Sequence, residues 1–146
     1  MPYHEEDVRI DLADWWHDAE AIRRVRAEVF IREQGIPASL EWDGRDADCD
    51  HVLAQDASGQ ALATARLMPD GRIGRMAVLE GWRRRGIGRR LLQLLLQQAR
   101  VRGLRETYLH AQTGVADFYR KAGFRNEGEV FVEAGLPHVH MFRTLD

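Results

Sequence analysis

The chain has 146 residues, of which 45% are hydrophobic and 30% charged, a size and composition typical of one folded domain and not of a disordered, fibrous or repetitive chain. Its formal net charge of −2 argues against a protein whose whole surface binds nucleic acid. We therefore expect a single domain over residues 1–146.

The sequence predicts a cytoplasmic protein without a membrane segment. Its longest apolar stretch, around residues 91–96, is far shorter than the roughly 20 residues that a membrane-spanning helix needs. Residues 1–7 are acidic and unlike a secretory signal. The one cysteine, Cys49, cannot form an internal disulfide, which agrees with a reducing compartment. A lone cysteine in a charged loop is usually incidental, so we do not expect it to be a nucleophile.

The first part of the chain reads as a strand, a helix and a loop. Residues 8–10 alternate in polarity and predict a short strand. Apolar residues recur at helical spacing over residues 22–30, with Asp18 expected to cap the start of this helix and Gly35 to end it. The acidic segment 41–50 is expected to form a loop on the surface.

Three strands should follow in direct succession. Residues 51–54, 61–68 and 72–78 have strand character, and the turn-forming residues 57–59 and 69–71 separate them. Short turns between consecutive strands predict an antiparallel meander.

The rest of the chain alternates helices and strands. A leucine-rich stripe predicts a buried helix over residues 87–102, followed by a strand at 107–111 and a short helix at 115–122. Two further strands are expected at 125–132 and 138–142. The whole order predicts an α+β fold with a mixed sheet covered by helices.

A glycine-rich turn lies between the third strand of the meander and the leucine-rich helix. It holds Gly86 and Gly88 among five arginines, namely Arg83, Arg84, Arg85, Arg89 and Arg90. Glycines at a strand-to-helix junction let backbone N–H groups approach a phosphate, and a helix N-terminus adds unpaired donors and a positive dipole end. The turn matches neither the Walker A loop nor the dinucleotide fingerprint. By itself it fits a pyrophosphate cradle and an ordinary tight turn with solvated arginines equally well.

The pattern Arg83-x-x-Gly86-x-Gly88 resembles the motif of the GNAT acyltransferase superfamily, which has Gln or Arg, two residues, Gly, any residue, and Gly or Ala. Residues 75–78 resemble the splayed fourth strand of that family, and residues 118–124 resemble its FYxKxGF segment. Residues 26–34 and 129–138 are similar to a narrower branch, the ElaA-like and YjcF-like acyltransferases. The resemblance covers nearly the whole chain.

This resemblance implies the GNAT fold, a central and mostly antiparallel mixed sheet of about six or seven strands flanked by about four helices. It implies a V-shaped gap between the fourth and fifth strands that holds the pantetheine arm of CoA. The implied reaction moves an acetyl group from acetyl-CoA directly to an amine, with no covalent enzyme intermediate. The acceptor would be a small or amino-acid-like amine, and dimers are common in the superfamily, so a homodimer is possible.

The residues implied to contact the cofactor lie on the fourth strand, on the turn and after the fifth strand: Met76, Ala77, Val78, Arg83, Arg84, Gly86, Ile87, Gly88, Arg89, Gln112, Phe118 and Tyr119. Main-chain groups of Met76 and Val78 would pair with pantetheine amides, and the Val78 N–H would polarise the thioester carbonyl. Many superfamily members have Asn at the position of Gln112, so this chain departs from the pattern there.

Four side chains are candidates for the chemistry at the acceptor. Tyr119 is the expected general acid for the departing thiolate, and its alternative is a tyrosine that only packs on the cofactor. His138 is the first candidate for the general base, against a purely structural histidine, and Glu33 is the second. Arg26 would bind an acceptor carboxylate unless it is a solvated helix arginine.

Two alternatives to an enzyme follow from the same residues. A catalytically idle module would bind acyl-CoA as a sensor, and the arginine cluster would bind nucleic acid if it does not hold CoA. Metal binding is not expected, because the aspartates of residues 43–50 lack the EF-hand pattern and His138-x-His140 lacks a third ligand.

Overall fold

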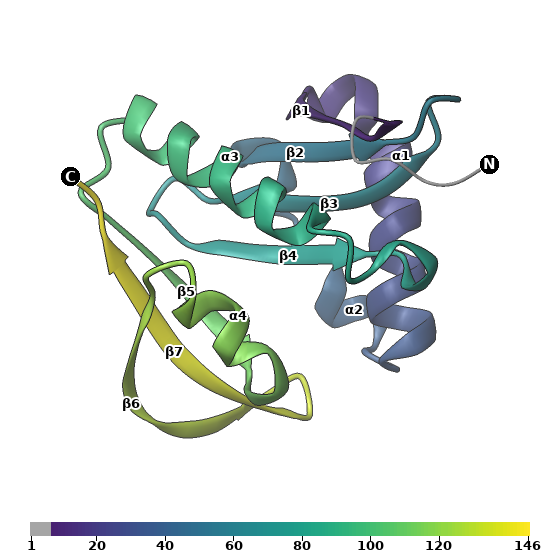
Figure 1. Cartoon of the computed structure of the whole chain (residues 1–146). Coiled ribbons are helices and arrows are strands. Elements are labelled where there is room, and N and C mark those ends of the chain that lie inside the picture. The colour runs from purple at the N-terminus through teal and green to yellow at the C-terminus, as the bar shows by residue number, and fades with distance from the viewer. Residues whose placement is uncertain (1–6) are drawn as a thin grey trace.

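The computed structural model describes residues 7–146, which contain seven β-strands and four α-helices (Figure 1). Residues 1–6, most of the acidic N-terminal stretch, lie outside the described residues. The α+β class and the GNAT-like architecture are confirmed. The strands form two antiparallel sheets, however, where the sequence predicted one mixed sheet.

The first sheet contains the predicted meander and one strand before it. Its order is β1 (Arg9–Ala13), β2 (Asp50–Gln55), β3 (Ala61–Leu67) and β4 (Ile73–Val78), all antiparallel. Every residue of β3 is buried, because helices cover both faces of this sheet. β1 lies slightly later in the chain than the predicted strand at residues 8–10.

The second sheet has the order β5 (Glu106–Gln112), β7 (Leu136–Thr144) and β6 (Arg125–Glu133), again antiparallel. One isolated parallel bridge, between Arg72 and Tyr108, connects it to the first sheet. In Figure 1 the two sheets splay apart from this point, with β4 and β5 on either side of the gap.

The helices cover the sheets through apolar faces. α3 (Ile87–Val101) packs on the face of the first sheet that carries Val52. α1 (Trp15–Arg26) packs on the face that carries Leu53, and a π-helical segment, Ala27–Glu33, continues it. The short helices are α2 (Ala38–Glu41) and α4 (Ala116–Arg120).

The start of α1 corrects one prediction. Asp14, not Asp18, is the N-cap, and its side chain accepts a hydrogen bond from the Trp16 N–H at 3.2 Å. Asp18 accepts from the Asp14 N–H at 3.0 Å, so the two carboxylates satisfy donors on both sides of the helix start. The helix therefore begins one turn earlier than the apolar pattern indicated.

The acidic segment at residues 41–50 was expected on the surface, and this is wrong for two of its carboxylates. Glu41 and Asp46 are 2% and 7% exposed. Both accept hydrogen bonds from Arg26, a buried residue of α1, at 2.8 and 2.6 Å. Buried charges are tolerated when they are paired, and this pairing folds the segment inward.

Candidate active site

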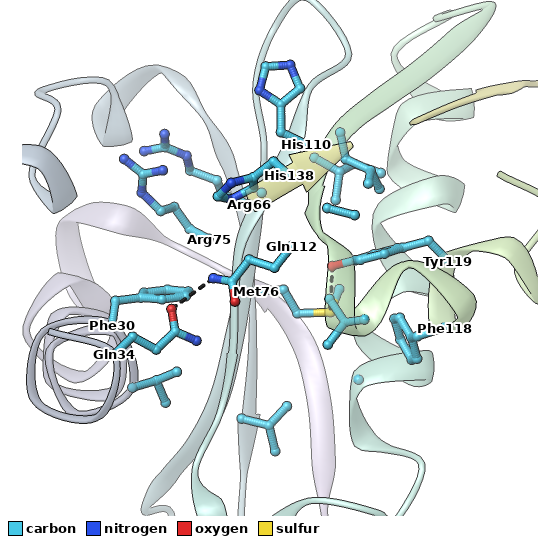
Figure 2. Close-up of a pocket in the computed structure, with 18 of the residues that line it drawn as sticks. Phe30, Gln34, Arg66, Arg75, Met76, His110, Gln112, Phe118, Tyr119 and His138 are labelled. Atoms are coloured by element: carbon cyan, nitrogen blue, oxygen red, sulfur yellow. Dashed lines mark hydrogen bonds between the residues drawn. The ribbon is translucent and has the colours of Figure 1, made fainter. Parts of the chain in front are cut away.

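A cavity of about 850 Å³ lies where β4 and β5 diverge, within the range of small-molecule sites (Figure 2). Its wall includes residues of both strands, the start of α3, the π-helical segment and α2. Beyond the Arg72–Tyr108 bridge, no ladder joins β4 to β5 in the described part of the chain. The edge of β4 that faces β5 is therefore not paired with another strand along the cavity.

The backbone N–H and carbonyl of Val78 point away from β3, the neighbouring strand. Leu79 donates its N–H to the Leu62 carbonyl at 3.0 Å, so the neighbouring antiparallel pair, Val78 with Ala63, is the non-hydrogen-bonded one. The N–H and carbonyl of Val78 consequently face outward. The carbonyl accepts a hydrogen bond from Arg83 Nε at 2.8 Å.

A β-bulge in β4 aims two consecutive side chains at the cavity. Arg66 pairs with Gly74 and Thr64 with Ala77, so two residues of β4, Arg75 and Met76, lie opposite one residue of β3. Arg75 adopts a left-handed backbone with φ 49°, which is uncommon outside glycine. Arg75 and Met76 both line the cavity, although successive residues of a regular strand face opposite sides.

The glycine-rich turn forms one end of the cavity. Gly86 is the N-cap of α3 with φ 78°, a conformation that favours glycine. The first intrahelical hydrogen bond there runs from the Arg90 N–H to the Gly86 carbonyl, so the N–H groups of residues 87–89 precede it. A Cβ added at Gly88 would lie 3.4 Å from the Phe118 ring, which is ordinary contact distance. The turn thus offers backbone donors beside the Phe118 ring.

Tyr119 and Phe118 approach the cavity from α4. The Tyr119 hydroxyl lies 3.8 Å from Met76 Sδ, which joins α4 to the bulged strand (Figure 2). Burial raises the pKa of Tyr119 to about 12, so the phenol keeps its proton at neutral pH. Its hydroxyl can therefore act as a proton donor.

His138 lies on β7 across from Gln112 of β5, and both line the cavity. Its side chain is almost completely buried, and its Nδ1 lies 2.8 Å from the Leu136 carbonyl. A carbonyl only accepts hydrogen bonds, so Nδ1 carries the proton and Nε2 has a free lone pair in the neutral ring. Gln112 itself donates to Gln34 Oε1 at 2.9 Å.

Glu33 does not line the cavity. Both its carboxylate oxygens lie 2.9 Å from Arg83 Nη2, which connects the π-helical segment to the glycine-rich turn. Ala77 is also off the cavity wall, because its side chain is buried against the α1 side of the sheet.

The structure does not bring Arg26 to the cavity. This side chain is 1% exposed, and each of its three guanidinium nitrogens donates a hydrogen bond to Glu41 or Asp46. The side chain therefore holds the acidic segment, and it is neither solvent-exposed nor on the cavity wall. The sequence did not reveal this, because Glu41 and Asp46 are 15 and 20 residues away.

Seven polar side chains on the cavity wall were missed by the sequence analysis: Gln34, Glu41, Arg66, Arg72, Arg75, His110 and Glu133. Arg66 had a usable signal, since it is a charge within a strand whose other residues are apolar or small. His110 and Glu133 had none, because they come from different strands. His110 Nδ1 lies 2.9 Å from Glu133, which also accepts from Arg72 at 3.1 Å. Burial lowers the pKa of His110.

Within residues 7–146, no group of three or more His, Cys, Asp or Glu side chains could hold a metal ion. None of the described helices is both long enough and apolar enough to cross a membrane.

Comparison with known proteins identifies the family. Residues 17–145 match the acetyltransferase (GNAT) domain family. The chain belongs to the GNAT acetyltransferase family. YjcF of Bacillus subtilis, an N-acetyltransferase of uncharacterised activity, is 34% identical over 122 residues, which are 82% of this chain and 87% of YjcF.

Two solved GNAT structures have similar backbones. An acyl-CoA N-acyltransferase from Pseudomonas aeruginosa is 32% identical with a TM-score of 0.82, over 94% of this chain and 98% of its own. Escherichia coli ElaA is 28% identical with a TM-score of 0.83, over 93% of this chain and 99% of ElaA. These matches confirm the ElaA-like and YjcF-like branch that the sequence indicated.

Proposed function

We propose that this GNAT protein transfers an acetyl group from acetyl-CoA to an amine in the cavity between β4 and β5. The observation that carries the proposal is that the glycine-rich turn, the free edge of β4 and the Tyr119 hydroxyl all border one cavity. A GNAT reaction needs these three elements for the pyrophosphate, the pantetheine arm and the leaving thiolate.

The cofactor would lie along the cavity from the turn to the bulge. The N–H groups of residues 87–89 suit the pyrophosphate, because donors at a helix start and its positive dipole end attract anions. Arg83, Arg84 and Arg89 line the same end and would add charge-assisted hydrogen bonds. The outward N–H and carbonyl of Val78 suit a pantetheine amide or the thioester.

The chemistry then needs a base, an acid and a route for the second proton that the amine nitrogen loses. A neutral amine attacks the thioester carbon, and the carbonyl oxygen, on which negative charge develops, is stabilised by the Val78 N–H. The C–S bond breaks as the amide forms, and Tyr119 donates its proton to the departing sulfur. Nε2 of His138 accepts the proton that the acceptor ammonium loses before attack. The amine nitrogen loses its second proton as the amide forms, and this proton restores the Tyr119 hydroxyl through solvent. His138 releases its proton to solvent, so the products are the amide, the CoA thiol and one proton.

Turnover tests this proposal directly. Purified protein is incubated with acetyl-CoA and a panel of primary amines, free CoA thiol is measured, and the acetylated product is identified by mass. The proposal expects thiol and product in equal amounts, with no thiol release above background when the amine is omitted. Acetyl-CoA binding without turnover of any amine would instead favour the acyl-CoA sensor.

A further inference from the structure

A largely buried charge network adjoins the cavity. It contains three arginines and three acids: Arg26, Arg66, Arg75, Glu41, Asp43 and Asp46. Arg26 lies behind the wall with all three nitrogens bonded. Arg66 and Arg75 line the cavity itself.

Arg66 has a donor that the protein leaves unused. Its Nη atoms donate to Asp43 and Asp46, and the side chain is 4% exposed. Its Nε–H is buried and has no hydrogen-bond partner. Buried polar groups in native proteins are almost always bonded, so an unpartnered guanidinium N–H on a cavity wall calls for an acceptor from elsewhere.

Arg75 is more accessible than Arg66, because the Arg75 side chain is 23% exposed and the Arg66 side chain is 4% exposed. Its Nη2 donates to the carbonyls of Leu40 and Glu41 at 3.2 Å and to Asp43 Oδ2 at 3.3 Å. Its Nε lies 3.3 Å from Glu41 Oε2, but this ion pair does not have hydrogen-bond geometry, and the Nε–H is also unpartnered.

The backbone of Arg75 supports a ligand-binding role. The bulge and the left-handed φ of 49° place this side chain on the cavity next to Met76, which contacts the Tyr119 hydroxyl. Uncommon backbone conformations of this kind cost energy and concentrate at binding and catalytic sites. Arg75 and Tyr119 thus line the same cavity.

We infer that Arg75, backed by Arg66, binds a carboxylate of the acceptor, so that the acceptor is a small amine that also carries a carboxylate. This inference rests on the proposed function. A planar guanidinium pairs with a planar carboxylate through two parallel hydrogen bonds. A phosphate would bring a second negative charge beside Glu41, Asp43 and Asp46, which already face the same arginines.

Two carboxylates, Glu41 and Asp43, already pair with Arg75, so an incoming carboxylate would share the guanidinium with them. Burial raises the pKa of Glu41, although Arg75 and Arg26 oppose the shift. Glu41 is therefore easier to neutralise than an exposed carboxylate, which lessens its repulsion of a second one. Burial alone would raise the pKa of Asp43, but hydrogen bonds from Arg66 and Arg45 outweigh it and lower this pKa, so Asp43 keeps its charge.

The test compares matched acceptors with the wild-type protein. The standard α-amino acids, β-alanine and 4-aminobutyrate are assayed beside their primary amides, which keep the amine and lose the negative charge. The inference expects kcat/KM for at least one acid to exceed that of its amide by about tenfold or more. Equal rates for every pair, or turnover of amides alone, would overturn it.

Two variants separate binding from a structural role of Arg75. Arg75→Gln should abolish the preference for the acid while acetyl-CoA binding is unchanged, and Arg75→Lys should restore part of it. Arg102→Gln, which removes an exposed arginine paired with Asp50, is the control and should keep the full preference. A preference that survives Arg75→Gln would contradict the assignment. Acetyl-CoA bound with no acid acetylated also contradicts it, whereas failure to bind acetyl-CoA would sink the proposed function instead.

Discussion

Arg83 donates through Nη2 to both carboxylate oxygens of Glu33 at 2.9 Å. The same side chain donates through Nε to the Val78 carbonyl at 2.8 Å. Arg83 is the first residue of the GNAT motif and lines the cavity. A CoA pyrophosphate and Glu33 would therefore compete for the Arg83 guanidinium. The Arg83–Glu33 ion pair thus affects how strongly Arg83 can bind the pyrophosphate.

Glu33→Gln should tighten acetyl-CoA binding, by up to about fivefold, because a partly exposed ion pair is worth little and its loss frees Arg83 for phosphate. The dissociation constant is measured by calorimetry. Glu28→Gln is the control, since Glu28 pairs with Arg32 on the same segment and does not line the cavity. Glu33→Gln should also keep the kcat of the wild type. A tenfold fall in kcat would make Glu33 the general base in place of His138.

Tyr119→Phe should lower kcat by about a hundredfold, the usual contribution of a general acid, with little change in acetyl-CoA affinity. Because burial raises the pKa of Tyr119 to about 12, its ionisation should cause no loss of wild-type rate below about pH 10. Steady-state kinetics against pH measures both effects. Tyr108→Phe, which alters a tyrosine off the cavity wall, should leave kcat unchanged. Equal kcat in wild type and Tyr119→Phe would remove Tyr119 as the acid.

His138→Gln should lower kcat/KM for the acceptor by about a hundredfold, the usual contribution of a general base, because the variant has no imidazole to take the proton of the acceptor. His140→Gln is the matched control, since His140 lies two residues later on β7 and does not line the cavity. Steady-state rates are compared at one pH and at saturating acetyl-CoA. A kcat/KM of His138→Gln equal to that of the wild type would leave the proton to another group or to water.

Asp46→Asn should lower the unfolding free energy at neutral pH by about 3 kcal/mol or more. The substitution removes a negative charge that balances the buried positive charges of Arg26 and Arg66. Urea denaturation followed by circular dichroism measures the change. Asp117→Asn is the control, because Asp117 is 84% exposed and pairs only with Arg120 on the surface. A change no larger than that of the control would mean that the network contributes little to stability.

The same carboxylate predicts a pH dependence. Burial alone would raise the pKa of Asp46, but hydrogen bonds and charge from Arg26 and Arg66 lower it below 3.8. A pKa that is lower in the folded state stabilises the fold above about pH 4 and loses that contribution as the pH falls through the folded-state value. Wild-type stability should therefore fall more steeply below about pH 4 than that of Asp46→Asn. Parallel curves would contradict this.

The sequence predicted the elements whose signals are local. The leucine stripe of α3, the turns of the meander and the glycines at residues 86 and 88 all act over one or two helical turns, and each element was found near its observed bounds. The family motifs then supplied the fold and the position of the cavity. The one-domain organisation, a homodimer and a cytoplasmic location stay predictions.

The errors concern interactions between distant residues. Arg26 was assigned to the acceptor because its carboxylate partners, on a segment that was expected at the surface, could not be inferred from spacing. Arg75 was overlooked because its place on the wall depends on a bulge whose register is set by β3. Pairing across strands and the burial of charge arise from tertiary packing, which a single sequence does not reveal.

The most direct test of the account is calorimetric titration of acetyl-CoA into wild type, Gly86→Asp and Gly103→Asp. The two glycines have φ of 78° and 76°, and a Cβ added at either would meet no atom within 4 Å, so backbone strain and added charge are matched. Of these two glycines, only Gly86 lines the cavity. We predict equal binding by wild type and Gly103→Asp, and at least about tenfold weaker binding by Gly86→Asp. Equal binding by both variants, or no binding by the wild type, would contradict a CoA site at the glycine-rich turn.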